Sequence, residues 1–204
     1  MGTKGEQTRK DILKIAESLI LQRGFAGTSI ERILEEAKIT KGGFFYHFDG
    51  KNDLARNLML QYLETDEIFF RDLLHRAREL SEDPLQQMLL FLKLLADAMA
   101  SLPDTHPGCL VAAFTYESQQ FNKDVHALVA EGILSWRKLF ADQLDQILLK
   151  YSPRVEIERA ELADMLTATI EGGIIMSRAL GDPRVLVQQI LQYRSYIRVL
   201  FDAS

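Results

Sequence analysis

Residues 28–48 read TSIERILEEAKITKGGFFYHF, and this stretch decides the fold of the first part of the chain. Thr28 and Glu31 have the spacing of a capping box, which makes Thr28 the predicted N-cap of a helix that continues to Ala37. Thr40 is the predicted N-cap of a second, very short helix that ends near His47. Two short helices joined by a tight turn predict a helix-turn-helix, whose second helix can enter the major groove of DNA.

The composition of the second short helix is unusual. Gly42 and Gly43 each cost roughly 1 kcal/mol relative to alanine in a helix, but they allow another surface to approach the backbone closely. Phe44 and Phe48 lie four residues apart, so we expect both to face inward and seat the helix. The helix N-terminus would offer N–H groups to a phosphate. On spacing alone, an ordinary surface turn explains the stretch about as well as a DNA contact does.

Outside this stretch the whole chain is predicted to be helical, because strand-like alternation and hairpin turn pairs are absent from the sequence. The fold class is therefore all-α, with about nine helices. Three short helices form a head, residues 1–52, and longer helices form a body, residues 53–204. The predicted helices cover approximately residues 12–23, 28–37, 40–47, 51–80, 84–102, 109–119, 122–150, 157–180 and 183–201.

Composition limits the class of protein. The 204 residues are 47% hydrophobic, enough for a core, yet no apolar run approaches the roughly 20 residues of a membrane helix. The first six residues do not begin a signal peptide. The net charge is −5, made of +1 from residues 1–55 and −6 from the rest, so only the first part is free of acidic excess. We expect a soluble cytoplasmic protein that does not enter a membrane.

The helical body carries two further features. The last two predicted helices are apolar on more than one face, which predicts either a homodimer contact or, in a monomer, a simply buried helix pair. The middle helices are rich in large apolar side chains, which indicates a pocket for an apolar or aromatic effector, with Glu117 and Gln120 as polar contacts. The candidate pocket residues are Phe70, Met88, Phe91, Met99, Phe114, Glu117, Phe121 and Trp136.

The only cysteine, Cys109, follows a Pro-Gly loop and is predicted to open a helix. A helix N-terminus can make a thiol reactive, so Cys109 is a candidate oxidant sensor, although a small buried apolar residue is the more common role. His106 and Cys109 alone are too few ligands for zinc. The sequence contains no motif of a common hydrolase, phosphate-binding loop or metalloprotease, so no enzyme activity, metal or cofactor is expected.

A set of short motifs occurs in order within residues 9–54. The motifs are Arg23-Gly24-Phe25, Gly27-Thr28-Ser29-Ile30, Ile33, Ala37, Thr40-Lys41-Gly42, Tyr46-His47-Phe48 and Lys51-Asn52-Asp53-Leu54. This set closely resembles the N-terminal DNA-binding domain of the TetR family of transcriptional regulators. The resemblance implies a homodimer formed by the last two helices, a ligand pocket among the helices between, and a repressor that leaves a palindromic operator when a small-molecule effector binds.

The same resemblance assigns roles to individual residues. Contacts with the DNA backbone would come from Thr28, Thr40, Lys41, Tyr46, His47 and Lys51, and base edges would be met at Gly42 and Gly43. Three positions depart from the family pattern. Lys38 replaces a glycine, so a positive φ at this position would carry modest strain. Phe45, which is also a candidate DNA contact, replaces a tyrosine, and Gly43 replaces a small polar residue. The last two departures leave open an alternative, a helical interaction module that has lost DNA binding. A thiol-based sensor that uses Cys109 is the other alternative.

Overall fold

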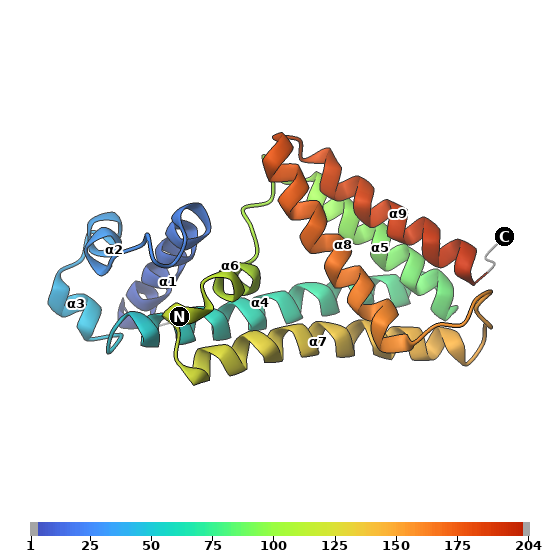
Figure 1. The fold of residues 1–204 in the computed structure, drawn as a ribbon, viewed down its shortest axis with the longest axis horizontal. Helices are drawn as coiled ribbons and strands as arrows, with labels where there is room; N and C mark the ends of the chain where they lie inside the picture. Colours follow the sequence, from blue (N-terminus) through green and yellow to red (C-terminus); the bar gives the residue numbers. More distant parts are fainter. Residues whose placement is uncertain (1–3, 202–204) are drawn as a thin grey trace. The chain divides into compact units, whose positions relative to one another are not determined.

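The computed structural model describes residues 4–201. Residues 1–3, which belong to the stretch examined above for a signal peptide, and residues 202–204 lie outside the described range. All regular structure within the described range is helical, as predicted (Figure 1). The elements are α1 (Lys4–Arg23), α2 (Ile30–Ala37), α3 (Lys41–Phe45), α4 (Lys51–Leu80), α5 (Pro84–Ala100), α6 (Leu110–Tyr116), the 3-10 helix η1 (Ser118–Gln120), α7 (Lys123–Leu148), α8 (Arg159–Leu180) and α9 (Arg184–Leu200). None of the helices in residues 4–201 combines the length and apolarity that a bilayer crossing demands.

The start of α2 differs from the prediction by one residue. Ser29, rather than Thr28, is the N-cap, and its hydroxyl accepts a hydrogen bond from the backbone N–H of Arg32. Thr28 is fully buried, and its hydroxyl donates to the carbonyl of Gly24 at 2.8 Å. Both residue types are common N-caps, and the hydrogen bond of Thr28 to Gly24 in the preceding turn leaves the capping role to Ser29.

Two other predicted helix starts are confirmed, whereas α3 ends at Phe45 rather than near His47 and α6 ends at Tyr116 rather than near Gln119. Thr40 caps α3 by accepting from the N–H of Gly43 at 3.1 Å. Pro84 begins α5 behind the N-cap Asp83, whose carboxylate accepts from the N–H groups of Leu85 and Gln86. A proline suits this position because the first N–H groups of a helix have no partner within the helix.

The chain forms two compact units, which divide α4 and α7 between them. The first unit comprises the residues up to Thr65 together with Pro107–Gly132, so α6 and the start of α7 belong with the helix-turn-helix. Within it α1 packs against α2 and α6, and α2 packs against α3 (Figure 1). Its core contains the fully buried side chains of Ile12, Ile33, Phe44, Leu54 and Phe114.

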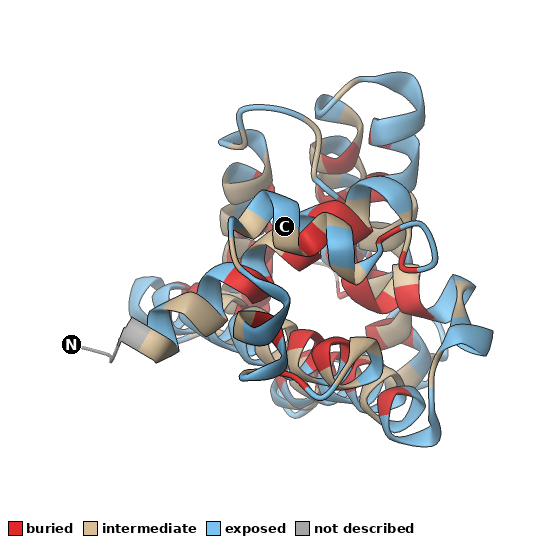
Figure 2. Cartoon of the chain, turned by 90° about the vertical axis from the view of Figure 1, so that its left-hand side faces the viewer, coloured by how far each residue is buried: buried red, intermediate tan, exposed pale blue. Residues whose placement is uncertain are grey.

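The second unit comprises Asp66–His106 and Ile133–Ser204. Within it α9 packs against α5 and α8, and the buried sides of the helices face inward (Figure 2). The ring of Phe140 lies 5.5 Å from Phe70 and 5.9 Å from Phe91, which joins α4, α5 and α7. The hydroxyl of Tyr193 donates to the carbonyl of Leu162 at 2.8 Å, so the buried tyrosine keeps a hydrogen bond between α9 and α8.

Candidate nucleic-acid interface

The turn between α2 and α3 has a strained residue at its centre. Lys38, the C-cap of α2, has φ 54° and ψ 42°, the left-handed conformation that glycine adopts most easily. It is the one non-glycine residue with positive φ in the described part of the chain. The strain predicted at this position is therefore confirmed, and the tight turn is made despite the side chain.

The two inward-facing phenylalanines seat α3 on the first unit as predicted. Phe44 is fully buried and Phe48 nearly so, and their ring centroids lie 5.5 Å apart. The guanidinium of Arg9, on α1, lies 5.3 Å from the centroid of the Phe48 ring. Burial of these two rings leaves the opposite side of the short helix available to solvent.

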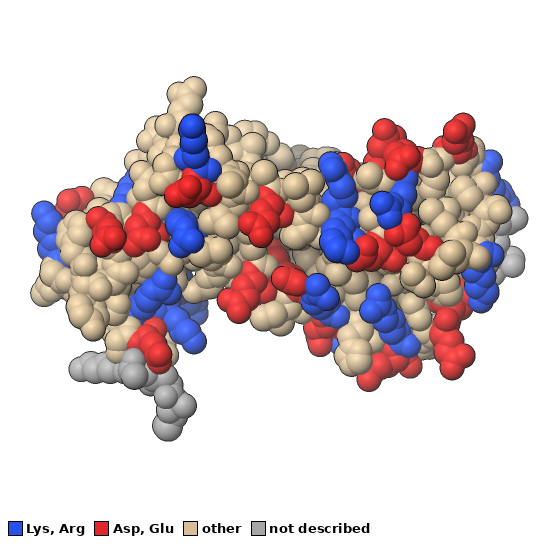
Figure 3. All heavy atoms as spheres, turned by 90° about the horizontal axis from the view of Figure 1, so that it is seen from below, with Lys and Arg blue, Asp and Glu red and all other residues tan. Residues whose placement is uncertain are grey.

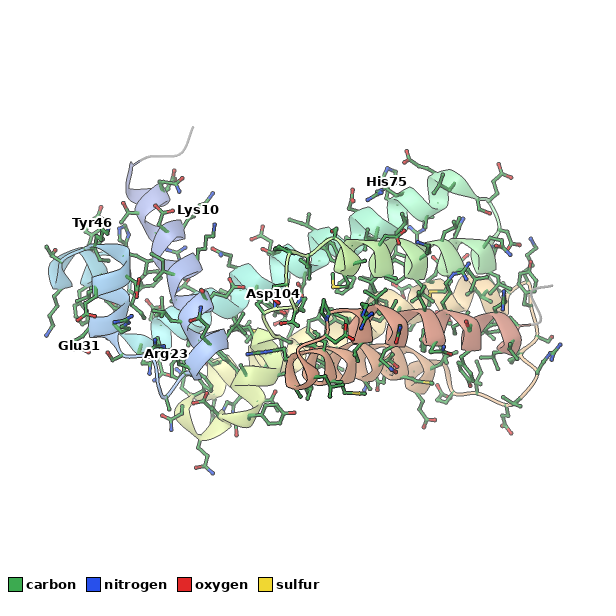
Figure 4. All side chains as sticks on the ribbon, turned by 90° about the horizontal axis from the view of Figure 1, so that it is seen from above. Lys10, Arg23, Glu31, Tyr46, His75 and Asp104 are labelled. Carbon is green, nitrogen blue, oxygen red and sulfur yellow. The ribbon has the colours of Figure 1, made fainter. Side chains whose placement is uncertain are left out.

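That opposite side presents aromatic and cationic groups. Tyr46 is 82% exposed and projects from the outer edge of the first unit (Figure 4). Phe45 is 43% exposed, and the ammonium of exposed Lys41 lies 6.0 Å from its ring centroid. His47 is half-buried and packs edge-on against Tyr46. These side chains can donate to phosphates or lie against a groove wall, which is the arrangement a recognition helix needs.

The backbone and packing of α3 do not require glycine at position 42 or 43. Neither has a positive φ. A Cβ added at Gly42 would lie 3.9 Å from the Thr40 hydroxyl, and one at Gly43 would lie 3.4 Å from it, both ordinary contacts. The fold therefore has room for a Cβ at either position, and neither position needs glycine for space.

Two predicted phosphate-binding residues lie inside the first unit. Thr28 is buried, and its hydroxyl donates to the carbonyl of Gly24. Lys51 is half-buried: its ammonium donates to the carbonyl of Phe25 and lies 4.2 Å from the centroid of the Phe25 ring. Burial lowers the pKa of Lys51, while the carboxylate of Glu117 acts in the opposite direction. Lys51 has three N–H donors, so one contact with Phe25 does not exhaust them.

The candidate pocket residues fall into two groups. Phe114, Glu117 and Phe121 belong to the first unit, where Phe114 and Phe121 stack at 4.3 Å and both contact Phe25. The other five belong to the second unit: Met88 and Phe91 are fully buried, Phe70 and Trp136 are nearly so, and Met99 is half-buried. Sequence reasoning missed this division, because nothing in the pattern of a helix states which neighbour its apolar face will meet.

A groove in the second unit lies between α4 and α7. Trp136, Leu74 and Leu139 are its apolar lining, and its charged lining includes the ion pairs of Arg71 with Glu67 and of Lys138 with Asp142. Among the predicted pocket residues, Trp136 is the one that lines it.

Cys109 is the N-cap of α6, and its sulfur accepts from the N–H of Ala112 at 3.5 Å. The predicted place at the start of a helix is confirmed, and the residue is buried and outside any disulfide.

The two C-terminal helices have an uncovered apolar side. Gly173 is required on their inner side, because an added Cβ would lie 2.8 Å from Leu186 of α9. Gly172 faces outward, with no heavy atom within 4 Å of an added Cβ. Large apolar side chains are exposed on the same two helices: Met165, Ile175, Met176, Leu180, Tyr196 and Val199.

Charge alone does not mark the interface. On the face that Figure 3 shows, basic and acidic side chains are interspersed. Several acidic groups of the first unit are bound within it: Arg32 of α2, for example, pairs with Glu35 and Glu36. The seating and exposure of α3 therefore carry more information than net charge does.

The chain is helical throughout its described part and carries a capped two-helix motif, which places it in the class of helix-turn-helix DNA-binding regulators. Family comparison makes the class specific. The model described as bacterial regulatory proteins of the tetR family matches residues 12–58, and the model of the C-terminal domain of LmrA/YxaF-like transcriptional regulators matches residues 84–190. The chain belongs to the TetR family, and it is a DNA-binding transcriptional regulator.

Individual relatives agree with this assignment. The HTH-type transcriptional regulator LmrA of Bacillus subtilis is 25% identical over 173 residues, which are 83% of this chain and 86% of that protein. The probable acrEF/envCD operon repressor of Escherichia coli K12 is 26% identical over 143 residues, 69% of this chain and 61% of that protein. A crystal structure of a TetR-family regulator from Agrobacterium tumefaciens has the same fold, with a TM-score of 0.80 at 22% identity over 95% of this chain and 98% of that one.

Proposed function

We propose that the chain is a homodimeric repressor that binds a two-fold symmetric operator through α3 and is released by a small-molecule effector. The observation that carries the proposal is the geometry of α3, which is capped by Thr40, seated by Phe44 and Phe48, and open on its other side. Related proteins named as repressors support the direction of regulation. The proposed site of action is the cytoplasm, and no catalytic step is assigned.

In this proposal residues 1–52 are the DNA-binding domain and residues 53–204 bind the effector and form the dimer. Lys41, Tyr46 and His47 contact phosphates from the exposed side of α3, and Phe45 lies against the groove wall. Gly42 and Gly43 let the helix backbone approach the base edges. Thr40 supports the site through the α3 cap and Thr28 supports it from within the unit. Lys51 holds the carbonyl of Phe25 and contacts a phosphate with its remaining donors.

The proposed dimer uses the exposed apolar side of α8 and α9, because two copies related by a two-fold axis would cover this surface for each other. The proposed effector pocket uses the apolar residues of the second unit: Phe70, Met88, Phe91, Met99 and Trp136. An effector that binds the conformation with poor operator affinity weakens DNA binding by its differential affinity for the two states. We expect the effector to be apolar or aromatic.

Selection of bound duplexes from a random pool tests the proposal directly. We expect recovery of a palindrome whose half-sites are about one helical turn apart, because the two recognition helices of a dimer read equivalent major grooves. A pool without an enriched motif contradicts sequence-specific binding. An enriched motif without two-fold symmetry contradicts the dimer. Small-molecule libraries screened for release of the recovered duplex then test the effector.

A further inference from the structure

Glu117, at the C-cap of α6, reaches the turn between α1 and α2. One carboxylate oxygen accepts from the N–H of Phe25 at 2.7 Å and the other accepts from the N–H of Ala26 at 2.7 Å. Both groups belong to the first compact unit although they lie more than 90 residues apart in sequence. Hydrogen bonds to an ionised carboxylate are about twice as strong as neutral ones, so this contact is a strong link between α6 and the turn.

The turn is shaped to receive the carboxylate. Gly24 has φ +78°, and a Cβ placed on it would lie 2.6 Å from the nearer carboxylate oxygen of Glu117. Glycine is therefore required twice, for backbone conformation and for space. The ring of Phe25 lies 5.6 Å from that of Phe114 and 4.4 Å from that of Phe121, on either side of Glu117 in sequence.

The ammonium of Lys51 binds the other side of the Phe25 peptide backbone. The carbonyl of Phe25 accepts from the ammonium of Lys51, at the start of α4. The N–H of Phe25 thus meets a carboxylate and its C=O meets an ammonium. The turn leads within three residues to Thr28 and to Ser29, the cap of α2, and α2 packs against α3.

We propose that Glu117 is a positioning residue for DNA binding, which holds the α1–α2 turn and through it the orientation of α2 and α3. The proposal rests on the proposed function above, since it names a residue on which the operator affinity of α3 depends. Both carboxylate oxygens of Glu117 accept a hydrogen bond from this turn, so the residue can affect DNA binding through the turn without touching the DNA.

The expected effect of removing the Glu117 carboxylate on DNA affinity is opposite to the usual effect of removing an acidic residue. Removal of an acidic residue from a DNA-binding unit ordinarily strengthens binding, because one repulsion with the phosphates is lost. At Glu117 we expect the opposite. Glu117→Ala should raise the Kd for the selected duplex about tenfold, the equivalent of about 1.4 kcal/mol, which is near the contribution of one hydrogen bond to a charged group. Glu131, exposed on α7 in the same unit, provides a control of equal charge.

The experiment measures the Kd of the parent, Glu117→Ala, Glu117→Gln and Glu131→Ala for the duplex that selection with the parent recovers. Amide hydrogen exchange at Phe25 and Ala26 is followed in the same proteins. Glu117→Gln retains one acceptor oxygen, so its Kd and its exchange should be intermediate, and Glu131→Ala should bind at least as tightly as the parent. Should Glu117→Ala fail to fold, the comparison of Glu117→Gln with Glu131→Ala decides the question with the same expected order.

Tighter or unchanged binding by both Glu117 variants would overturn the positioning role, as would parent-like exchange at Phe25 and Ala26. Loss of affinity with parent-like exchange would overturn it as well, because the effect would then not pass through the turn. A parent that enriches no duplex contradicts the proposed function instead, and this result is distinct because it appears before any variant is compared.

Discussion

Gly43 offers the sharpest separation of fold from DNA recognition. A Cβ at this position would lie 3.4 Å from the Thr40 hydroxyl and 3.8 Å from Cβ of Ile39, so alanine fits without displacement. Alanine is about 1 kcal/mol better than glycine in a helix interior, and leucine is nearly as good. Because α3 is only one turn and a half long, we expect Gly43→Ala and Gly43→Leu to raise the free energy of unfolding by about 0.5–1 kcal/mol.

DNA binding should move in the opposite direction. If α3 lies in the groove, leucine at position 43 separates the helix from the base edges in each half-site. A disturbed base contact costs about 1–3 kcal/mol, so two half-sites lose about 2–6 kcal/mol, at least a thirtyfold rise in Kd. Gly43→Ala should have a smaller effect of the same sign. The dependence of log K on log salt should not change, because no charge is altered.

The assay is fluorescence anisotropy with the selected duplex and with a random duplex across a salt series, beside urea denaturation. Ala130→Leu is a matched control, because it adds an exposed leucine to α7 in the same compact unit but outside α3. It should bind the selected duplex as the parent does. If Gly43→Leu binds the selected duplex as tightly as the parent, α3 does not lie in the groove and the placement of the recognition helix is wrong.

Four further predictions concern other parts of the molecule. Lys51→Ala should lower both stability and the salt slope, the latter by about two units in a dimer, because the ammonium supports Phe25 and remains able to neutralise a phosphate; an unchanged slope would restrict Lys51 to the structural role. Ile175→Glu, on the exposed side of α8, should reduce the mass seen by light scattering from twice 23.3 kDa to a single chain; a parent that is already monomeric contradicts the dimer. Burial alone would raise the pKa of Asp83, but hydrogen bonds from Lys150 and Tyr151 lower this pKa to about 2. The contribution of Asp83 to stability is therefore complete above about pH 4 and is lost as the pH falls toward 2. The free energy of unfolding of Asp83→Asn, measured in urea, should depend less on pH in this interval, and an equal dependence would assign the acid sensitivity to other groups. Finally, Cys109→Ser should bind DNA normally and lose any response to oxidants, whereas a response kept in this variant would rule out the thiol sensor.

Local patterns were sufficient for most of the fold. Thr40 as the cap of α3, Pro84 at the start of α5 and the inward Phe44 and Phe48 all follow from interactions within a few residues of sequence. At Lys38 the family pattern has a glycine, which indicated a left-handed residue, and the conformation is set locally by the end of α2. Such features are predictable because the groups that interact are neighbours along the chain.

Other features depended on contacts that no local pattern records. Thr28 and Ser29 are both suitable caps, and the buried hydrogen bond of Thr28 to Gly24 leaves the role to Ser29. The sequence offered Glu117 as a polar contact of the effector pocket, and tertiary packing places its carboxylate on two N–H groups some 90 residues away. Periodicity determined that this chain is helical, and the Thr40 cap determined where α3 begins, although α3 ends at Phe45 rather than near His47. Which helix the apolar face of α6 meets was decided only by the tertiary structure, because an apolar face can be buried equally well by many partners and the choice among them is made by shape and by the few polar groups that must be satisfied.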